Sequence, residues 1–493
     1  MEDHETDTHD SKYTLFPVRQ KDGTMYYYAS DYSEELGNSV YKGYRCTLKN
    51  TEIKEEELKR RRFNKEEINI FATAPVAIKF YPQDQSPSPY QFYASQIAIV
   101  PIQGCNALIM DFIDGFHIFP DIRDNPQIRL LTFAQAADIA WQLVLGLNHY
   151  HYNNTSGQAI VHGDVKGTNI KIRMKEIDVN GIKKHKYDVF YLDPDYAKPI
   201  GPHAQHKQGT SEHLALEVLD GLYSEESDFF ALSPVLLSLF GAYNPFSRIF
   251  EFRDRHPDMG QAELVRQLRA IDFCSTGLFG HFSTKPTLLV CQLVEQFTLQ
   301  MGAKLKNNRP SSNAILEFFT SLRQLSLLND LKQDTTPYLL RLCIATQDMN
   351  WFRKESLRTL FIELEEHLQN RLIAIMNYQQ TAALYKVLKE HKSEPALLNR
   401  LRGKIAEHLM EQSYSLEEPS CLSSIFSSPV GPKDLQWFLN CYQQNNHSEF
   451  YATKNKKIRD KLIHCSDKKI SDSVSIIADG LHRIIETATP SIN

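Results

Sequence analysis

The 493-residue sequence lacks the patterns that mark several classes of protein. Its cysteines form no CxxC pair and have no regular spacing, so they predict neither a zinc site nor a disulfide framework and fit a reducing cytosol. The most apolar stretch, 229–243, is too short and too interrupted to span a bilayer, and the acidic start lacks the apolar run of a signal peptide. We therefore expect no membrane span. The cysteines are Cys46, Cys105, Cys274, Cys291, Cys343, Cys421, Cys441 and Cys465.

The sequence also lacks an excess of charge of one sign. Its 55 basic and 60 acidic residues give a net charge of −5, so no field of the whole chain attracts nucleic acid, and we do not expect nucleic acid as a partner. A hydrophobic content of 42%, with 11% aromatic residues, is enough to bury sizeable cores. The length predicts several domains, or one large two-lobed unit with an appendage.

The first part of the chain has the patterns of strands. Residues 1–12 are polar and predict a disordered tail, whereas 24–50 alternates aromatic and polar residues, which predicts strand, turn and strand. In 51–67, glutamates precede Lys and Arg by three and four residues, which predicts an exposed helix. The apolar segment 74–81 again predicts a strand.

The pattern becomes helical after Leu131. Thr132 and Gln135 have the spacing of a capping box, and the apolar residues that follow predict a helix of about five turns. A hydrophilic segment, 175–188, has an Asn-Gly pair at its centre and predicts a hairpin insert that leads into the strand 189–193. Beyond Leu214 almost every segment has helical periodicity.

The last third of the sequence matches no motif. It begins at a leucine-rich junction, 324–338, and is interrupted by a Ser- and Pro-rich segment, 414–434, that predicts an exposed loop. Its apolar stripes are most simply core. Exposed aromatics such as Trp351 and Trp437 would permit a docking surface for a protein partner instead.

The segment IVHGDVKGTNIKI, residues 160–172, holds the residues that suggest chemistry. Asp164, Lys166 and Asn169 follow one another at offsets of two and three. A carboxylate can orient or accept the proton of a substrate hydroxyl, an ammonium can neutralise a moving phosphoryl group, and an amide oxygen suits Mg²⁺. The plain structural alternative is a tight turn between a strand and a helix, with Asn169 as a turn residue.

Further segments in the same order resemble the eukaryotic-type protein kinase family. FYLDPDYAK resembles its metal-binding motif at Asp193, and GTSEHLALEVL resembles its substrate-binding segment, ending at Glu217. SDFFALSPVLLSLF resembles its central helix, anchored by Asp228, and NNRPSS resembles the late arginine, Arg309, that pairs with Glu217. The resemblance implies that His162 supports the catalytic loop and that Thr210 bonds to Asp164 and Lys166.

The resemblance implies an α+β fold of two lobes, like that of a protein kinase, with an additional all-α C-terminal domain. We expect an N-lobe at 13–115 with the charged insert 51–67, a C-lobe at 116–325, and a helical domain at 326–493. ATP with Mg²⁺ or Mn²⁺ is the implied cofactor. The implied nucleotide contacts are Lys79 of VAIK, the hinge residues Met110, Asp111 and Ile113, and Gly37, where the glycine-rich loop lacks its first two glycines.

The sequence departs from the family pattern beside Lys79 and after Asp193. The family pairs the strand lysine with a glutamate of a helix, but 82–100 contains no Glu, so Gln91, Gln96 or Asp84 would substitute or the pair would be missing. Asp-Pro-Asp replaces the usual Asp-Phe-Gly. Asp195 would then be an extra metal ligand or, as we favour slightly, an exposed turn residue.

A third departure concerns activation. Gly163 stands where many kinases have an arginine that receives a phosphate, and 198–209 contains no Ser, Thr or Tyr that could carry one. The two absences agree, so we expect activity without phosphorylation of this segment. His203 and His206 lie in it, and we expect them to face solvent rather than bind a metal.

The resemblance therefore implies an enzyme that transfers the γ-phosphoryl of Mg-ATP to a Ser or Thr of a protein. A scaffold with the same fold but no activity stays open, as does transfer of AMP or another group. The divergent core, hairpin insert and unmatched tail resemble kinases that intracellular bacterial pathogens deliver into host cells, which would place the protein in a host cytosol.

Overall fold

The computed structural model describes residues 12–414, apart from 21, 38, 51–52, 54, 59–60, 86–95, 103, 153–157, 180, 204–208 and 347–348. Several expectations lie outside these residues: the tail 1–11, Gln91, His206, most of the loop 414–434, and Trp437. The contacts divide the chain into one compact unit that ends at Leu327 and a second that begins at Leu328.

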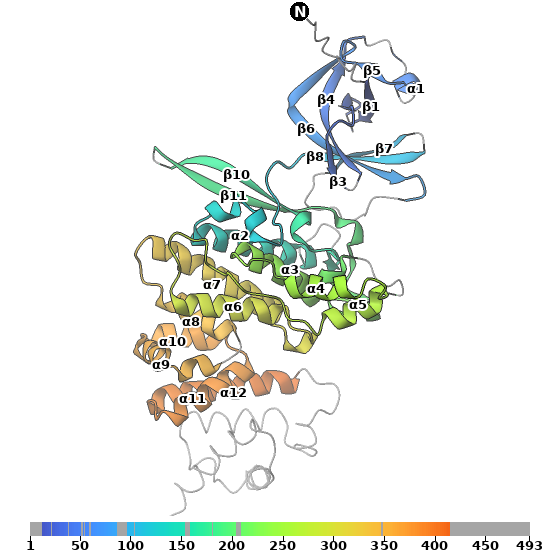
Figure 1. Ribbon diagram of the computed structural model, residues 1–493. Helices are drawn as coiled ribbons and strands as arrows, with labels where there is room; N and C mark the ends of the chain where they lie inside the picture. Colours follow the sequence, from blue (N-terminus) through green and yellow to red (C-terminus); the bar gives the residue numbers. More distant parts are fainter. Residues whose placement is uncertain are drawn as a thin grey trace, which may run out of the picture. The chain divides into compact units, whose positions relative to one another are not determined.

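The first unit begins with an eight-stranded antiparallel sheet (Figure 1). Its order is β5-β1-β2-β4-β6-β8-β7, and β3 pairs with β4. β1 also packs against β7, and Phe16 of β1 shares an apolar core with Ile78 and Val100, so the sheet curls back on itself. The strands are β1 (Lys12–Arg19), β2 (Met25–Ser30), β3 (Glu35–Gly37), β4 (Val40–Leu48), β5 (Phe63–Asn64), β6 (Ile68–Pro82), β7 (Gln96–Ile102) and β8 (Cys105–Asp111).

The helix expected over 51–67 is wrong. Among the described residues of this range, the helix is limited to α1 (Glu55–Leu58), and the strand β5 begins at Phe63. Phe63 is completely buried and pairs with Tyr13 of β1, so burial of this aromatic side chain draws the segment into the sheet. The charged residues instead stabilise the turn, where Arg61 bonds to Glu67 at 2.8 Å.

The rest of the first unit is mainly helical. The capping box at the start of α2 is present, because the Thr132 N–H donates to Gln135 and the Gln135 N–H donates to Thr132. α3 is buried from Ser227 to Leu239, which explains why its sequence is mainly apolar after Asp228. The helices are α2 (Phe133–Tyr152), α3 (Glu225–Leu239), α4 (Ser247–Arg255), α5 (Gln261–Leu268), α6 (Leu288–Met301) and α7 (Ser312–Asp330).

Short strands and 3₁₀ helices connect these helices. The strand pairs are β9 (Ile160–Val161) with β12 (Lys198–Pro199), and β13 (Gly201–Pro202) with β14 (Leu222–Tyr223). The 3₁₀ helices are η1 (Ile122–Asp124), η2 (Ile128–Leu130), η3 (Gly167–Asn169), η4 (Pro194–Tyr196), η5 (Ser211–His213), η6 (Leu216–Asp220), η7 (Lys306–Asn308) and, in the second unit, η8 (Met349–Arg353).

The predicted hairpin insert is confirmed and is longer than expected. β10 (Ile170–Val179) and β11 (Ile182–Tyr191) pair along their whole length, and Figure 1 shows the hairpin projecting beyond α2. Only two residues connect the strands, and Gly181 takes the left-handed conformation, φ +79°, that such a turn needs. Gln142 of α2 holds the base of the hairpin by bonding to the backbone of Tyr187 and Val189.

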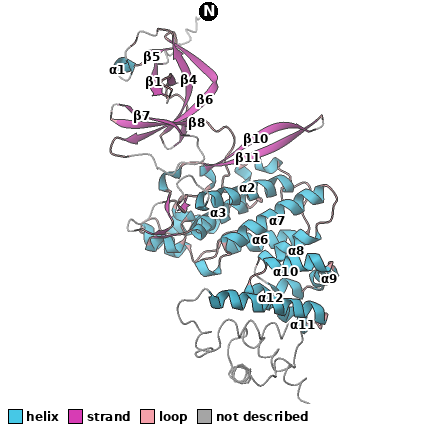
Figure 2. Ribbon diagram, turned by 180° about the vertical axis from the view of Figure 1, so that it is seen from behind, coloured by secondary structure: helices cyan, strands magenta, loops and turns pink. Residues whose placement is uncertain are grey.

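The described part of the second unit, up to residue 414, consists of helices and their connections (Figure 2). Trp351, expected to be exposed, is only 9% exposed because its ring packs inside this unit, so it cannot serve as a docking residue. Across residues 12–414 no helix has the length and hydropathy to cross a membrane. The helices are α8 (Thr336–Ala345), α9 (Glu355–Glu363), α10 (Glu366–Ile375), α11 (Tyr378–Glu390) and α12 (Pro395–Tyr414).

Candidate active site

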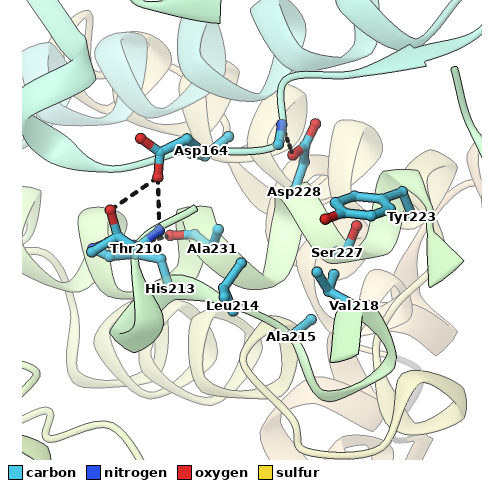
Figure 3. Close-up of a pocket in the computed structure, with 12 residues that line it drawn as sticks. Asp164, Thr210, His213, Leu214, Ala215, Val218, Tyr223, Ser227, Asp228 and Ala231 are labelled. Carbon is cyan, nitrogen blue, oxygen red and sulfur yellow. Dashed lines mark hydrogen bonds between the residues drawn. The ribbon is translucent and has the colours of Figure 1, made fainter. Parts of the chain in front are cut away.

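Three polar side chains surround the carboxylate of Asp164, which lies in the loop between β9 and η3. Lys166 Nζ and Asn169 Nδ2 each lie 2.9 Å from Asp164 Oδ2. Thr210, from the segment before η5, donates both its N–H and its hydroxyl to Oδ1, each at 2.9 Å (Figure 3). Lys166 also donates to the Thr210 hydroxyl at 3.1 Å. The four residues form one network.

This network sets the charge of Asp164. The residue is only 4% exposed, and burial by itself would raise its pKa. The hydrogen bonds and charge of Lys166, with the hydroxyl of Thr210, outweigh burial and hold the pKa below its ordinary value. Asp164 is therefore a carboxylate at neutral pH, fixed in orientation and able to accept a proton or a hydrogen bond.

Asp228, near the start of α3, holds the backbone of the same loop. Its carboxylate accepts from the N–H of His162 at 2.7 Å, from the N–H of Gly163 at 3.0 Å and from Nε2 of His151 at 3.0 Å. Gly163 has φ +79°, and a Cβ there would lie 2.5 Å from the carbonyl oxygen of Tyr196. The loop geometry thus requires glycine at this position and leaves no room for an arginine.

A second group of side chains surrounds Lys79 of β6. Its ammonium forms ion pairs with Asp193 and Asp195, both in the segment that follows β11. Burial would lower the pKa of Lys79, but the two carboxylates raise it above its ordinary value. The two groups adjoin each other, because the N–H of Leu192, the residue before Asp193, donates to the Asn169 carbonyl oxygen at 2.7 Å.

Asp195 is an exposed residue of the 3₁₀ turn η4, as slightly favoured from the sequence, but its carboxylate has partners that the sequence did not predict. Its Oδ2 lies 2.7 Å from Lys79 Nζ, and its Oδ1 accepts from the Tyr81 hydroxyl at 2.8 Å. Of the substitutes expected for the missing Glu, Asp84 is exposed in the turn after β6, Gln91 lies outside the described residues, and Gln96 begins β7, where its backbone pairs with that of Met110.

The expected hinge residues lie at the end of β8. Met110 and Asp111 pair with Ala77 and Val76, just before Lys79 in β6, and Ile113 follows as a buried residue. Gly37 lies at the turn between β3 and β4, and β4 begins opposite Lys79 in the sheet register. The strand β6, which carries Lys79, therefore lies between β4, next to the glycine turn, and β8, at whose end the hinge residues lie.

Two cavities lie near these groups, but neither is lined by both Lys79 and Asp164. One of about 490 Å³ is lined by Arg45, Arg173 and the hinge residues 111–113, but not by Lys79 or Asp164. The other, of about 10 Å³, lies beneath Asp164 between His213 and Asp228 (Figure 3). It has room for about one water molecule.

The segment after Thr210 is anchored by a buried ion pair. Arg309, after η7, bonds to both oxygens of Glu217, at 2.5 and 3.1 Å. Arg269, also buried, donates to the backbone carbonyls of Ser211 and Glu212. The pairing of Glu217 with Arg309 was expected. The role of Arg269 was not, because no sequence motif marks this residue and its partners lie 58 and 57 residues earlier in the chain.

Several features near the site differ from expectation or were missed. His203 does not simply face solvent: it is half-buried, and its Nε2–H donates to the Pro199 carbonyl at 2.6 Å. Tyr81 and His151 were missed. Strand alternation could have revealed Tyr81, which lies two residues after Lys79 on the same face. Nowhere in the described chain do three or more His, Cys, Asp or Glu side chains gather as a metal site.

Comparisons with known proteins find similarity over part of this chain. Residues 99–318 match the family model described as the protein kinase domain. Calcium-dependent protein kinase 4 of Plasmodium falciparum and that of Plasmodium berghei are each 27% identical over 145 residues, or 29% of this chain and 25% of the relative. The chain thus spans about a quarter of the length of these relatives. The granulovirus kinase PK-1 of Cydia pomonella is 19% identical, with a TM-score of 0.36, over 57% of this chain and 90% of that one.

Residues 99–318 therefore carry a protein kinase domain, and this range includes Asp164, Asn169 and Asp193. The range begins after Gly37 and Lys79. The predicted fold class is confirmed: a kinase fold with a β-rich N-terminal sheet, a helical region after it and further helices at the C-terminal side.

Proposed function

We propose that the protein is a serine/threonine kinase that transfers the γ-phosphoryl group of Mg-ATP to a protein hydroxyl. One observation carries the proposal: Asp164 with Lys166 and Asn169, and Lys79 with Asp193, form two adjoining networks. A nucleotide and a hydroxyl could reach both together. Positioning and charge stabilisation supply most of the catalysis in phosphoryl transfer, and fixed charged groups provide both.

In this proposal Asp164 orients the substrate hydroxyl and receives its proton as the phosphoryl group moves. Its lowered pKa keeps it ionised at neutral pH, and Thr210 fixes the direction of its carboxylate. Lys166 lies beside the same carboxylate and would neutralise charge on the transferred group. Lys79 would hold the phosphates of the nucleotide, with Gly37 and the hinge residues Met110, Asp111 and Ile113 around the rest of it.

Asn169 and Asp193 would hold the metal ion. Mg²⁺ is bound by one or two carboxylate or amide oxygens together with substrate phosphates, so two protein ligands are enough. The Asn169 amide nitrogen already donates to Asp164, which leaves the amide oxygen as the atom for a cation. When bound, Mg²⁺ or Mn²⁺ would neutralise charge on the phosphates.

The choice of Ser and Thr over Tyr rests on Lys166 and on the Gly-Thr pair that ends at Thr210. Lys166 lies between Asp164 and Thr210 and would face a short hydroxyl side chain. We also propose that the domain over 326–493 offers a docking surface for a protein partner, and that 13–115 and 116–325 are the two lobes. A cytosolic location and delivery into a host cell stay predictions from the sequence.

The test is transfer of label from γ-labelled ATP to a generic protein substrate with Mg²⁺ or Mn²⁺, with the mass of the product measured. Asp164→Asn and Asp193→Asn should lower the rate at least about 100-fold, because each removes a charge used in the transition state. Asp258→Asn, at an exposed position outside the site, should keep the wild-type rate.

Equal background from the wild type and both variants would favour a scaffold without activity. An added mass larger than one phosphoryl group would instead favour transfer of AMP. Circular dichroism of each variant separates loss of chemistry from loss of the fold.

A further inference from the structure

Lys79 is a buried cation whose partners come from an unexpected part of the chain. It is only 8% exposed, and an unpaired ammonium in such a place would carry a large desolvation cost. Within the described residues its ion pairs are with Asp193 and Asp195, which lie 114 and 116 residues further along the chain. Both partners belong to the single segment Asp-Pro-Asp.

The two carboxylates differ in what else they can do. Asp193 adjoins Asn169 and is the proposed metal ligand, so a bound cation would draw its charge away from Lys79. Asp195 is committed on both oxygens, one to Lys79 at 2.7 Å and one to the Tyr81 hydroxyl at 2.8 Å. Asp195 is thus the carboxylate that stays with Lys79.

Tyr81 gives Asp195 a second hydrogen bond to β6, in addition to the one from Lys79. Lys79 and Tyr81 lie two residues apart in β6 and share one face of the sheet, and the ammonium lies 5.3 Å from the centre of the Tyr81 ring. A carboxylate that reaches both side chains fixes the direction of the lysine, because a swing of the ammonium would break the bond to Asp195 while Tyr81 holds that carboxylate still.

The backbone around Asp195 explains why Pro replaces the usual aromatic residue. Asp193 has φ +57°, and Pro194 begins the 3₁₀ helix η4, whose first turn carries Asp195. The fixed φ of proline suits the first position of such a turn. The turn thereby sets Asp195 beside Asp193, so both carboxylates reach one ammonium.

We infer that Asp195 is the positioning residue of Lys79, in the place that a glutamate from a separate helix takes in the protein kinase mechanism. The inference rests on the proposed function, in which Lys79 holds the nucleotide phosphates. It also means that one segment, Asp193–Asp195, supplies both the proposed metal ligand Asp193 and the partner that directs Lys79. The arrangement then needs no movement of another element to complete it, in agreement with the expectation of activity without phosphorylation of 198–209.

The test measures the Kd of a fluorescent ATP analogue with Mg²⁺, together with KM for ATP and kcat, on the full chain. Asp195→Asn should weaken nucleotide binding and raise KM about tenfold or more, because Lys79 loses its fixed direction. Tyr81→Phe should have a smaller effect in the same sense, about threefold, since it removes only the support of Asp195. Asp84→Asn is the matched control and should change nothing.

A double-mutant cycle with Lys79→Met separates positioning from general damage. If Asp195 acts through Lys79, adding Asp195→Asn to Lys79→Met should not weaken nucleotide binding further. Additive effects, or an unchanged Kd in Asp195→Asn, would overturn the inference. A wild type that binds nucleotide without transferring phosphoryl would contradict only the proposed function, whereas a wild type that binds no nucleotide would contradict both.

Discussion

Glu217 and Arg309 form a bidentate ion pair that joins the segment after Thr210 to a residue 92 positions further along the chain. The Arg309 side chain is 1% exposed and that of Glu217 is 13% exposed. The remaining guanidinium donors bond to backbone carbonyls, including that of Ala303 at 2.8 Å. A buried guanidinium with all these partners fixes the segment that contains Glu217 to the helical part of the first unit.

Glu217→Gln should therefore destabilise the first unit by about 3–5 kcal/mol, because it leaves the buried charge of Arg309 without its carboxylate. Urea unfolding followed by fluorescence measures the loss. Arg255→Ala is the control: it breaks the exposed pair with Glu251 within α4 and should cost about 0.5 kcal/mol or less. Equal losses in the two variants would show that burial of the Glu217 pair contributes nothing.

Thr210 should support catalysis through its hydroxyl. Thr210→Val keeps the shape of the side chain but removes the hydrogen bonds to Asp164 and Lys166, so kcat should fall about 10- to 100-fold. Thr210→Ser keeps the hydroxyl and should restore most of the rate. Steady-state kinetics on both variants makes the test, and a Ser variant as slow as the Val variant would contradict it.

Activity should not depend on phosphorylation of 198–209, which contains no Ser, Thr or Tyr. Gly163 adds a structural reason, because its close contact with the Tyr196 carbonyl excludes the side chain that would receive a phosphate. Protein treated with a phosphatase and freed from it should keep the full rate from the first turnover. A lag that ATP preincubation removes would show that phosphorylation elsewhere in the chain activates it.

The parts of the fold and site that the sequence predicts are those whose determinants lie close together in the chain. Asp164, Lys166 and Asn169 lie within six residues, so one loop brings their side chains to a common point. The capping box at Thr132 and the Asn-Gly turn before β11 are equally local. Such features depend on backbone geometry over a few residues, which composition and spacing express directly.

The parts that the sequence does not predict depend on distant contacts. Phe63 lies in a segment with helical charge spacing, yet its burial against the strand that carries Tyr13 overrides that preference. Asp195 and Lys79 are separated by 116 residues in the sequence. The family pattern predicts a glutamate from a helix as the partner of Lys79, so it gives no reason to look for this partner at Asp195. Trp351 is buried for a similar reason, because tertiary packing rather than local pattern decides its exposure.

The stability of the first unit should fall as pH falls from about 6.5 to about 4, in part because of His213. Burial, with the charge of Arg269, lowers the pKa of His213 to about 4, although its Nδ1–H bond to the Ala231 carbonyl and nearby acidic groups oppose this. Between these pH values the His213 ring binds a proton in the unfolded chain but stays neutral in the folded protein. The neutral ring therefore stabilises the fold above pH 6.5, and this contribution is lost as the pH falls below that value.

His213→Asn keeps a donor near Nδ1 but cannot titrate, so the difference in unfolding free energy between wild type and variant should shrink from pH 6.5 to pH 4. Parallel urea unfolding profiles for the wild type and His213→Asn from pH 7 to pH 4 would contradict the assignment of this pH dependence to His213.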